Sequence, residues 1–255
     1  MLNLGYGQIA VTSAIAVALA MEAGIPILPA AALGLLIGGL FGLFLDLTIL
    51  RPVYRLRGEA RVLLSLLLTL GVSFIVDGFL NWRFPLKTLN LHIGGGAVEI
   101  LGVPMRRGSL VASAITLATF AGLFVFFGRT SLGRAIRSVI EDEEGARLIG
   151  IDPKKMLRLI LVLSGVLAAL VAVTRSMVAP VDTKSGLSIT VFALIVTVVG
   201  GLGNVVGALL AGIILGIVNV IAADFIGSYI SLIILLVAAA VTILIRPAGL
   251  LGVKE

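Results

Sequence analysis

The stretch Ile27–Leu50 reads ILPAAALGLLIGGLFGLFLDLTIL, and Asp46 is its only charged residue. A helix that crosses the hydrocarbon core of a bilayer needs about 20 consecutive apolar residues. Outward from this stretch, the chain holds further runs that meet or approach that length. They are Ile9–Met21, Val62–Leu80, Leu110–Phe127, Leu159–Val178, Val191–Ala223 and Tyr229–Ile245. We therefore expect a chain that crosses the membrane many times.

The composition of the 255 residues indicates the same class of protein. Hydrophobic residues make up 60% and charged residues 13% of the chain, against roughly 45–50% and 25% in soluble domains. This excludes a soluble enzyme and a disordered tail, and the absence of cysteine excludes a secreted disulfide scaffold. Because alternating strands of about ten residues are also missing, we expect an all-α polytopic transmembrane helical bundle. It should have about seven to eight spans in a single domain, residues 1–255.

The basic residues fall into short blocks between the apolar runs. Four arginines lie in Arg51–Arg61, and seven basic residues lie in Arg129–Arg158. Cytoplasmic loops of membrane proteins carry an excess of Lys and Arg, so both blocks should be cytoplasmic, and the net charge of +6 does not indicate a nucleic-acid partner. The connections Arg83–Gly108 and Ala179–Thr190 should then be external. His92, in the first of these, has no second His or Cys nearby, so no metal site is expected.

The run Val191–Ala223 is interrupted by glycines at 200, 201, 203 and 207. Each glycine costs a helix interior about 1 kcal/mol relative to alanine. We predict that the run breaks, with the chain entering and returning around Gly200–Gly207. Non-helical backbone at membrane depth is tolerated only where it is buried in protein or lines a cavity. Candidate residues of a translocation pathway in this break are Gly200, Gly201, Gly203 and Asn204.

A second candidate for the pathway is a polar stripe in the third run. Ser65, Thr69, Ser73 and Asp77 follow one another at steps of four, which places them along one face of a helix. Hydroxyl groups at such positions often form interhelical hydrogen bonds, whereas an acid in a spanning helix tends to face a cavity or a partner. The stripe therefore either joins helices or lines the solute path. Close helix packing, either within the chain or across an interface with another subunit, is also predicted by small-residue spacings at Gly34/Gly38/Gly42, Gly203/Gly207 and Gly212/Gly216.

The segment 129–158 is the one long charged stretch of the chain. Its acidic residues 141–144 suit the N-terminal end of a short helix, and Gly150 suits the position just past the C-terminal end. Asp152-Pro153 is a typical N-cap and first residue of the next helix. The pattern predicts a short helix rigidly joined to a spanning helix. The segment is either a solvated loop or a stiff connection that transmits force to the spanning helix.

The sequence Glu144-Gly145-Ala146-Arg147-Leu148-Ile149-Gly150 resembles the Glu-Ala-Ala, three residues, Gly signature of ATP-binding cassette importer permeases, with glycine for the first alanine. Other elements resemble the branched-chain amino acid permease family (the LivH/LivM group), and the chain is LivH-like. These elements are Leu2–Gln8, Ser131–Val139, Val199–Ala208 and Arg246–Gly252. They cover nearly the whole chain in family order. Family chains usually have one more span before the first element, so we expect either that the start of the chain is mis-assigned or that one N-terminal span is lost here.

The resemblance implies a permease subunit of an importer that moves branched-chain or related amino acids. Its implied partners are a homologous permease subunit in a homo- or heterodimer, two cytoplasmic ATPase subunits, an extracytoplasmic solute-binding protein and the lipid bilayer. Its implied location is the cytoplasmic (inner) membrane of a prokaryote. The residues expected to couple it to the ATPase are Glu141, Glu143, Glu144, Gly145, Ala146, Leu148, Gly150 and Asp152. The chain has no Gly-Lys dipeptide and hence no phosphate-binding P-loop, so ATP should be bound by partner subunits. No cofactor, metal or catalytic residue is expected in this chain.

Two other classes of protein match the sequence less well. An ion-coupled secondary transporter of small polar solutes would have several ionisable residues at mid-membrane and inverted repeats with matching broken helices. In this sequence, only Asp77 is such an ionisable residue, and only one helix break is predicted. A membrane enzyme would need a catalytic cluster, which one histidine does not supply. The identity of the solute stays open at this point.

Overall fold

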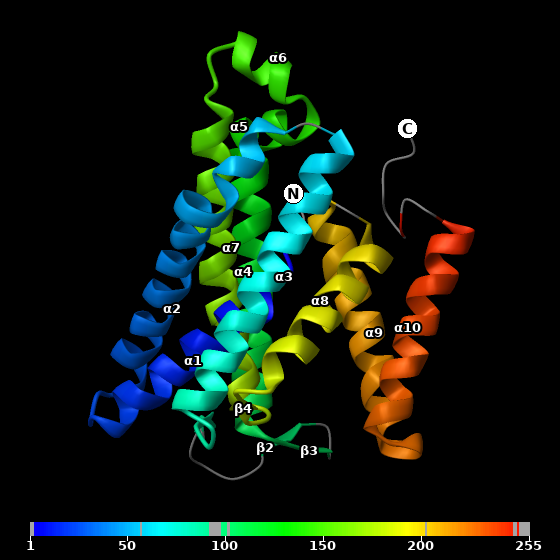
Figure 1. Ribbon diagram of the computed structural model, residues 1–255. Coiled ribbons are helices and arrows are strands. Elements are labelled where there is room, and N and C mark those ends of the chain that lie inside the picture. Colours follow the sequence, from blue (N-terminus) through cyan, green and yellow to red (C-terminus); the bar gives the residue numbers. More distant parts are fainter. Residues whose placement is uncertain are drawn as a thin grey trace. The chain divides into compact units, whose positions relative to one another are not determined.

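The structure is a computed structural model that describes residues 3–56, 58–91, 98–100, 103–201, 203–246 and 249 (Figure 1). Helices make up most of it. They are α1 Tyr6–Glu22, α2 Ile27–Phe44, the π-helical turn η1 Leu45–Leu50, the 3₁₀ turn η2 Pro52–Arg55, α3 Gly58–Arg83, α4 Arg107–Arg129, α5 Ser131–Glu141, α6 Glu143–Leu148, α7 Pro153–Ser176, α8 Ser185–Gly200, α9 Val205–Ile226 and α10 Ser228–Ile245. The strands are β1 Thr88–Leu89, β2 Val98–Ile100, β3 Val103–Met105 and β4 Val181–Asp182. His92 and the end of the element Arg246–Gly252 lie outside the described residues.

The apolar runs of the sequence all form helices, which confirms the all-α polytopic fold. Among the described residues, five helices are long and apolar enough to cross a membrane: Ile27–Leu50, Gly58–Arg83, Arg107–Arg129, Pro153–Ser176 and Val205–Ile226. Three shorter apolar helices accompany them: Tyr6–Glu22, Ser185–Gly200 and Ile230–Ile245. The shorter ones arise where turns interrupt the apolar sequence, as at Gly24, whose φ is +85°.

The chain forms two compact units, Met1–Ile189 and Thr190–Glu255. In the first unit, α1 is the most enclosed helix, and its residues Ile9, Ala10, Val11 and Ala14 are at most 1% exposed. It packs against α2 and α7 and also contacts α3. Because a small, almost uncharged helix can be surrounded on all sides, α1 forms the core around which the longer helices gather.

Glycines bring α2 close to its neighbours, as the small-residue spacing predicts. A Cβ atom on Gly38 would lie 2.4 Å from the Gly165 carbonyl oxygen of α7, and one on Gly42 would lie 2.2 Å from the Leu161 carbonyl oxygen. Gly34 faces α1 instead, where an added Cβ would lie 2.4 Å from a methyl carbon of Val17. Without side chains at these positions the backbones approach closely, which maximises van der Waals contact where no hydrophobic effect operates between helices.

The loops of the first unit lie at two ends, as the charge pattern predicts. Arg61, in the first basic block, contacts Glu143 in the second, so the two blocks share one end. At the other end, β1 pairs with β4 in antiparallel register, Thr88 opposite Asp182 and Leu89 opposite Val181. This pairing joins the two connections that we expect to be external.

In the second unit, the long glycine-rich run is broken, and this prediction is confirmed. Helix α8 ends at Gly200, Gly201 and Gly203 have φ values of +99° and +82°, and α9 begins at Val205. The Asn204 side chain caps α9 by accepting the N–H of Gly207 at 2.9 Å. A Cβ on Gly200 would meet the backbone of Gly207, so the helix ends touch across the break.

Further from the break, apolar side chains of α8 and α9 pack in one cluster, which includes Ile195 and Val199 of α8 and Ala211 and Leu215 of α9. A Cβ on Gly212 would lie 3.8 Å from Val196. Helix α10 then packs on α9, where the Ser231 hydroxyl donates to the Asn219 side chain at 2.6 Å. A Cβ on Gly216 would meet no described atom within 4 Å. Close packing of this glycine is therefore expected against another subunit and not within the described part of the chain.

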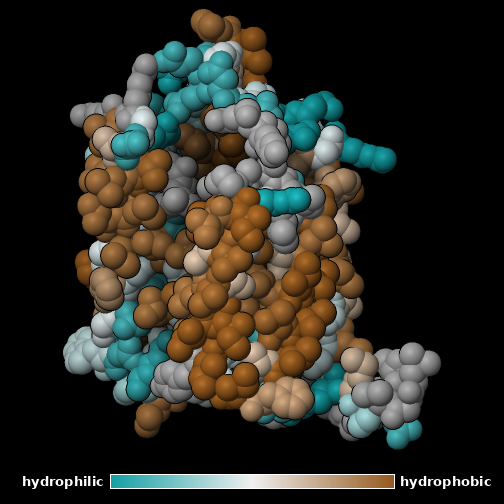
Figure 2. All heavy atoms as spheres, turned by 90° about the vertical axis from the view of Figure 1, so that its right-hand side faces the viewer, coloured by the Kyte–Doolittle hydropathy of each residue, from teal (hydrophilic) through white to brown (hydrophobic). Residues whose placement is uncertain are grey.

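The outward faces of the helices carry large apolar side chains. On α10, Val237, Ile243 and Leu244 are 55%, 50% and 85% exposed. Figure 2 shows hydrophobic side chains gathered in this way over one face of the molecule, with hydrophilic ones towards the ends. Such exposure would be unstable in water and is what a lipid-facing surface requires.

Candidate coupling site

The short helix α6 begins at a capping carboxylate. Asp142 has an extended backbone, and its Oδ1 accepts the N–H of Glu144 at 3.0 Å. Glu143 and Glu144 lie in the first turn, where the helix dipole favours negative charge. The short helix that the sequence places around Glu143–Ile149 is thereby confirmed at Glu143–Leu148.

The C-terminal end of α6 is a tight turn that leads directly into α7. Gly150 has a φ of +86°. Its N–H donates to the Arg147 carbonyl at 3.1 Å and that of Ile151 to the Ala146 carbonyl at 3.0 Å, the two bonds of a Schellman motif. Asp152 then caps α7 by accepting the N–H of Lys154 at 3.0 Å. With the groups at this turn paired, α6 and the base of α7 are rigidly joined.

The side chains of α6 and its C-terminal turn divide into a buried and an exposed set. Ala146 is 3% exposed and faces the fold, whereas Leu148 and Ile149 are 89% and 73% exposed. A Cβ on Gly145 would lie 2.5 Å from the capping carboxylate of Asp142. Glycine in place of the alanine of the family signature therefore leaves room for this cap. Two large apolar side chains remain uncovered at the tip.

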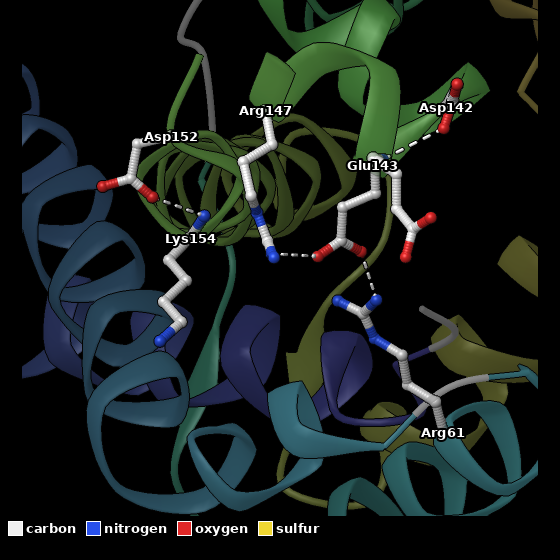
Figure 3. A network of polar contacts seen from close by, with 7 residues as sticks. Arg61, Asp142, Glu143, Arg147, Asp152 and Lys154 are labelled. Atoms are coloured by element: carbon white, nitrogen blue, oxygen red, sulfur yellow. Dashed lines mark hydrogen bonds and ion pairs between the residues drawn. The ribbon is translucent and has the colours of Figure 1, made fainter. Parts of the chain in front are cut away.

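Glu143 connects α6 to α3. Its carboxylate pairs with Arg61 at 2.5 Å and with Arg147, one turn along the same helix, at 3.5 Å. Figure 3 shows Glu143 between the two guanidinium groups. A polar pocket of about 450 Å³ opens beside them, lined by residues of both elements. Its lining is Tyr54, Leu56, Gly58, Arg61, Glu141, Asp142, Glu143, Glu144 and Arg147.

A buried acid next to this site was not identified as functional from the sequence. Asp46 is 1% exposed. It accepts a hydrogen bond from the Tyr54 hydroxyl and pairs with the Arg158 guanidinium at 2.7 Å. Burial, and next the bond to Asp46, raise the pKa of the Tyr54 phenol above its usual value of 10.0, so it stays a donor at physiological pH. The available sequence signal was that Asp46 is the only charged residue of the run Ile27–Leu50. Its ion pair could not be predicted from neighbouring residues, because Arg158 is 112 residues away.

The polar stripe of α3 faces the start of the chain. The Thr69 hydroxyl accepts the N–H of Leu4 at 3.0 Å, and the Ser73 hydroxyl donates to the Leu4 carbonyl at 3.0 Å. Asp77 accepts a hydrogen bond from the Gln8 amide at 3.1 Å. Ser65, at 0% exposure, donates to the Val62 carbonyl of its own helix. The contacts of Thr69, Ser73 and Asp77 join α3 to the start of the chain, as the helix-joining interpretation predicts, whereas the Ser65 contact stays within α3.

The same stripe continues one step beyond the residues singled out from the sequence. Asn81, four residues after Asp77, accepts a hydrogen bond from the Thr183 hydroxyl at 2.9 Å. The spacing rule that found the stripe would have found Asn81 if it had been extended past the apolar run. The other pathway candidates, Gly200, Gly201, Gly203 and Asn204, belong to the second unit.

We expect Asp77→Ala to lower the thermal unfolding midpoint of the purified chain, because the buried Gln8 amide loses its acceptor. An interhelical hydrogen bond of this kind contributes about 0.6–1.7 kcal/mol. Asp77→Asn keeps an acceptor oxygen and should retain both stability and solute uptake. Loss of uptake by Asp77→Asn at an unchanged midpoint would instead assign the carboxylate to the solute path.

An all-α multi-pass bundle with a capped helix fixed to the base of a spanning helix has the architecture of a transporter's membrane subunit. Comparison with known proteins specifies the family. The family described as "Branched-chain amino acid transport system / permease component" matches residues 1–245, and the chain belongs to it. Members of this family are membrane subunits of transport systems and not enzymes.

Two curated relatives illustrate the range of the family. The chain is 27% identical over 192 residues to the high-affinity branched-chain amino acid transport system permease protein BraD of Pseudomonas aeruginosa, covering 69% of this chain and 61% of BraD. It is 32% identical over 104 residues to the fructose import permease protein FruF of Bifidobacterium longum, covering 40% of this chain and 28% of FruF. The chain thus spans less than two thirds of either relative. No solved structure matches it.

Proposed function

We propose that the chain is the membrane-spanning permease subunit of an ATP-binding cassette importer. The observation that carries the proposal is the rigid turn at Gly150, which joins an exposed helix tip to a spanning helix. Force applied to Leu148 and Ile149 is transmitted to α7, because no flexible loop separates them from that helix. The coupling residues are those of α6 and its caps: Glu141, Glu143, Glu144, Gly145, Ala146, Leu148, Gly150 and Asp152.

The partners follow from this role. Two ATPase subunits bind ATP on the cytoplasmic side and receive α6, a homologous permease completes the pathway, and an extracytoplasmic binding protein delivers the solute. The chain then acts as one permease domain in the inner membrane of a prokaryote. The solute is a branched-chain or related amino acid, which the longer match, to BraD, favours over the shorter match to FruF.

The experiment that tests this function is uptake by proteoliposomes that contain the chain, its sister permease and the ATPases. Uptake should require both internal ATP and the external binding protein, and the solute retained by that binding protein should be the one transported. Uptake driven by a proton or sodium gradient without ATP would reject the proposal in favour of an ion-coupled transporter.

We expect Leu148→Glu to reduce the amount of ATPase that co-purifies with the chain. A buried apolar anchor at the centre of an interface contributes about 2 kcal/mol or more, and a carboxylate cannot replace it. The matched control is Leu86→Glu, at a leucine that is 92% exposed between α3 and β1. It should retain the ATPase fully. Equal capture by both variants would show that the tip of α6 is not the docking surface.

A further inference from the structure

The contacts of Glu143 and of Asp46 belong to one continuous series of side chains. Glu143 of α6 pairs with Arg61 of α3 at 2.5 Å. The Arg61 guanidinium lies over the Tyr54 ring of η2, 5.8 Å from its centre, and Tyr54 donates to Asp46 of η1. Asp46 pairs with Arg158 of α7 at 2.7 Å. We call these five residues the polar ring.

The polar ring is closed by the backbone. Helix α6 leads through Gly150 and Asp152 into α7, and Arg158 lies in the second turn of that helix. The ring therefore starts at α6, passes through the ends of α3 and α2, and returns to α7 close to where α6 joins it. A helix held at one end only can pivot about its joint, whereas a helix held by a closed ring cannot.

We propose that the polar ring, through Arg61, is a second connection that transmits motion of α6 to α3 and α2, in addition to the backbone connection to α7. This inference rests on the proposed function, because it assigns a path to the force that the ATPases apply. Arg61 is a positioning residue, because it acts through its ion pair with Glu143.

Burial gives the ring its stiffness. Asp46 is 1% exposed, and the side chains of Arg61 and Glu143 are 17% and 30% exposed. Ion pairs at the protein surface contribute about 0–1 kcal/mol, but removing one partner of a buried pair leaves an uncompensated charge. Only Arg158, at 46% exposure, reaches well into solvent. The ring should therefore persist while the bundle moves.

The connection through Arg61 also leads to the polar stripe of α3, which is a candidate functional feature. Arg61 is one turn before Ser65, the first residue of the polar stripe that holds Leu4 and Gln8. Motion passed to Arg61 would reach the contact between α3 and the start of the chain. Through the backbone joint to α7, the same motion would reach α1 and α2 mainly by helix packing.

The test uses the complete transporter in proteoliposomes and measures solute transported per ATP hydrolysed. We expect Arg61→Glu to lower this ratio about tenfold, with ATP hydrolysis and ATPase capture retained. Arg61→Lys keeps a cation against both Glu143 and the Tyr54 ring and should hold the ratio within about threefold of the unmodified transporter. Loss of the ratio in Arg61→Glu and its retention in Arg61→Lys, at equal yields of the two variants, is a result that a general loss of stability would not give.

The matched control is Arg51→Glu, which changes the charge of the same basic block equally but lies outside the ring. It should leave the ratio unchanged. A normal ratio in Arg61→Glu, or a ratio in Arg61→Lys as low as that in Arg61→Glu, would overturn the inference while the proposed function stands. Absence of ATP-driven uptake in the unmodified transporter would reject both.

Discussion

Gly150→Val should uncouple the transporter: uptake should fall about 10–100-fold while the chain inserts normally and the ATPases continue to hydrolyse ATP. Gly150 has a φ of +86°, and an L-residue in this conformation costs about 1–2 kcal/mol, more when it is β-branched. Valine will release that strain by opening the turn, which breaks the Gly150 and Ile151 hydrogen bonds and detaches α6 from α7. The measurement is solute uptake and ATP hydrolysis in the same proteoliposomes.

Two variants separate loss of the turn from general damage. Gly150→Asn should couple nearly normally, because asparagine tolerates the left-handed conformation. Gly24→Val introduces the same strain at a φ of +85°, in the turn between α1 and α2, where a Cβ meets no described atom within 4 Å. It should transport normally. Normal transport by Gly150→Val would contradict the stiff connection on which the proposed function depends.

Gly165→Leu should prevent the chain from accumulating in a folded form. A Cβ on Gly165 would lie 2.1 Å from the carbonyl oxygen of Gly38, which is backbone and cannot rotate away. Separating α2 from α7 would remove the packing along both helices and expose the polar ring, since Asp46, in η1 directly after α2, pairs with Arg158 of α7. Overpacking typically costs 1–3 kcal/mol, occasionally more, and a backbone clash should exceed about 3 kcal/mol. The measurement is the yield of monodisperse protein after detergent extraction.

The matched control is Gly71→Leu in the middle of α3. A Cβ there would meet no described atom within 4 Å, and replacing a helical glycine favours the helix by up to about 1 kcal/mol. This variant should be obtained at normal yield with an equal or higher unfolding midpoint. Equal yields of the two variants would mean that α2 and α7 do not meet at Gly38 and Gly165.

The local features of the coupling site could be predicted from neighbouring residues. The caps at Asp142 and Asp152 and the turn at Gly150 depend on bonds that span no more than five residues, so their sequence signals are direct. The break at Gly200–Gly207 was predictable for the same reason. The roles of Arg61 and Tyr54 were not, because Arg61 belongs to a block whose positive charge is already accounted for by orientation, and its partner Glu143 is 82 residues away.

The polar stripe is an intermediate case. Its spacing predicts that Ser65, Thr69, Ser73 and Asp77 share a face, but hydroxyls that join helices and hydroxyls that line a path follow the same spacing. The contacts with Leu4 and Gln8 support the first interpretation. A helical period specifies a face and does not specify what lies against it.

The sequence by itself determined that the chain belongs in a membrane, which apolar runs form its spanning helices, and that a short capped helix is joined to a spanning one. Each of these follows from hydrophobic length or from bonds between near neighbours. The sequence did not determine the helix bounds, since α8 begins at Ser185 within a stretch expected to be a connection. Only the tertiary structure decided that α1 is surrounded, that α2 and α7 meet at glycines, and that Asp46, Tyr54, Arg61, Glu143 and Arg158 form one ring. These depend on contacts between distant residues, which no local pattern of charge or hydrophobicity specifies.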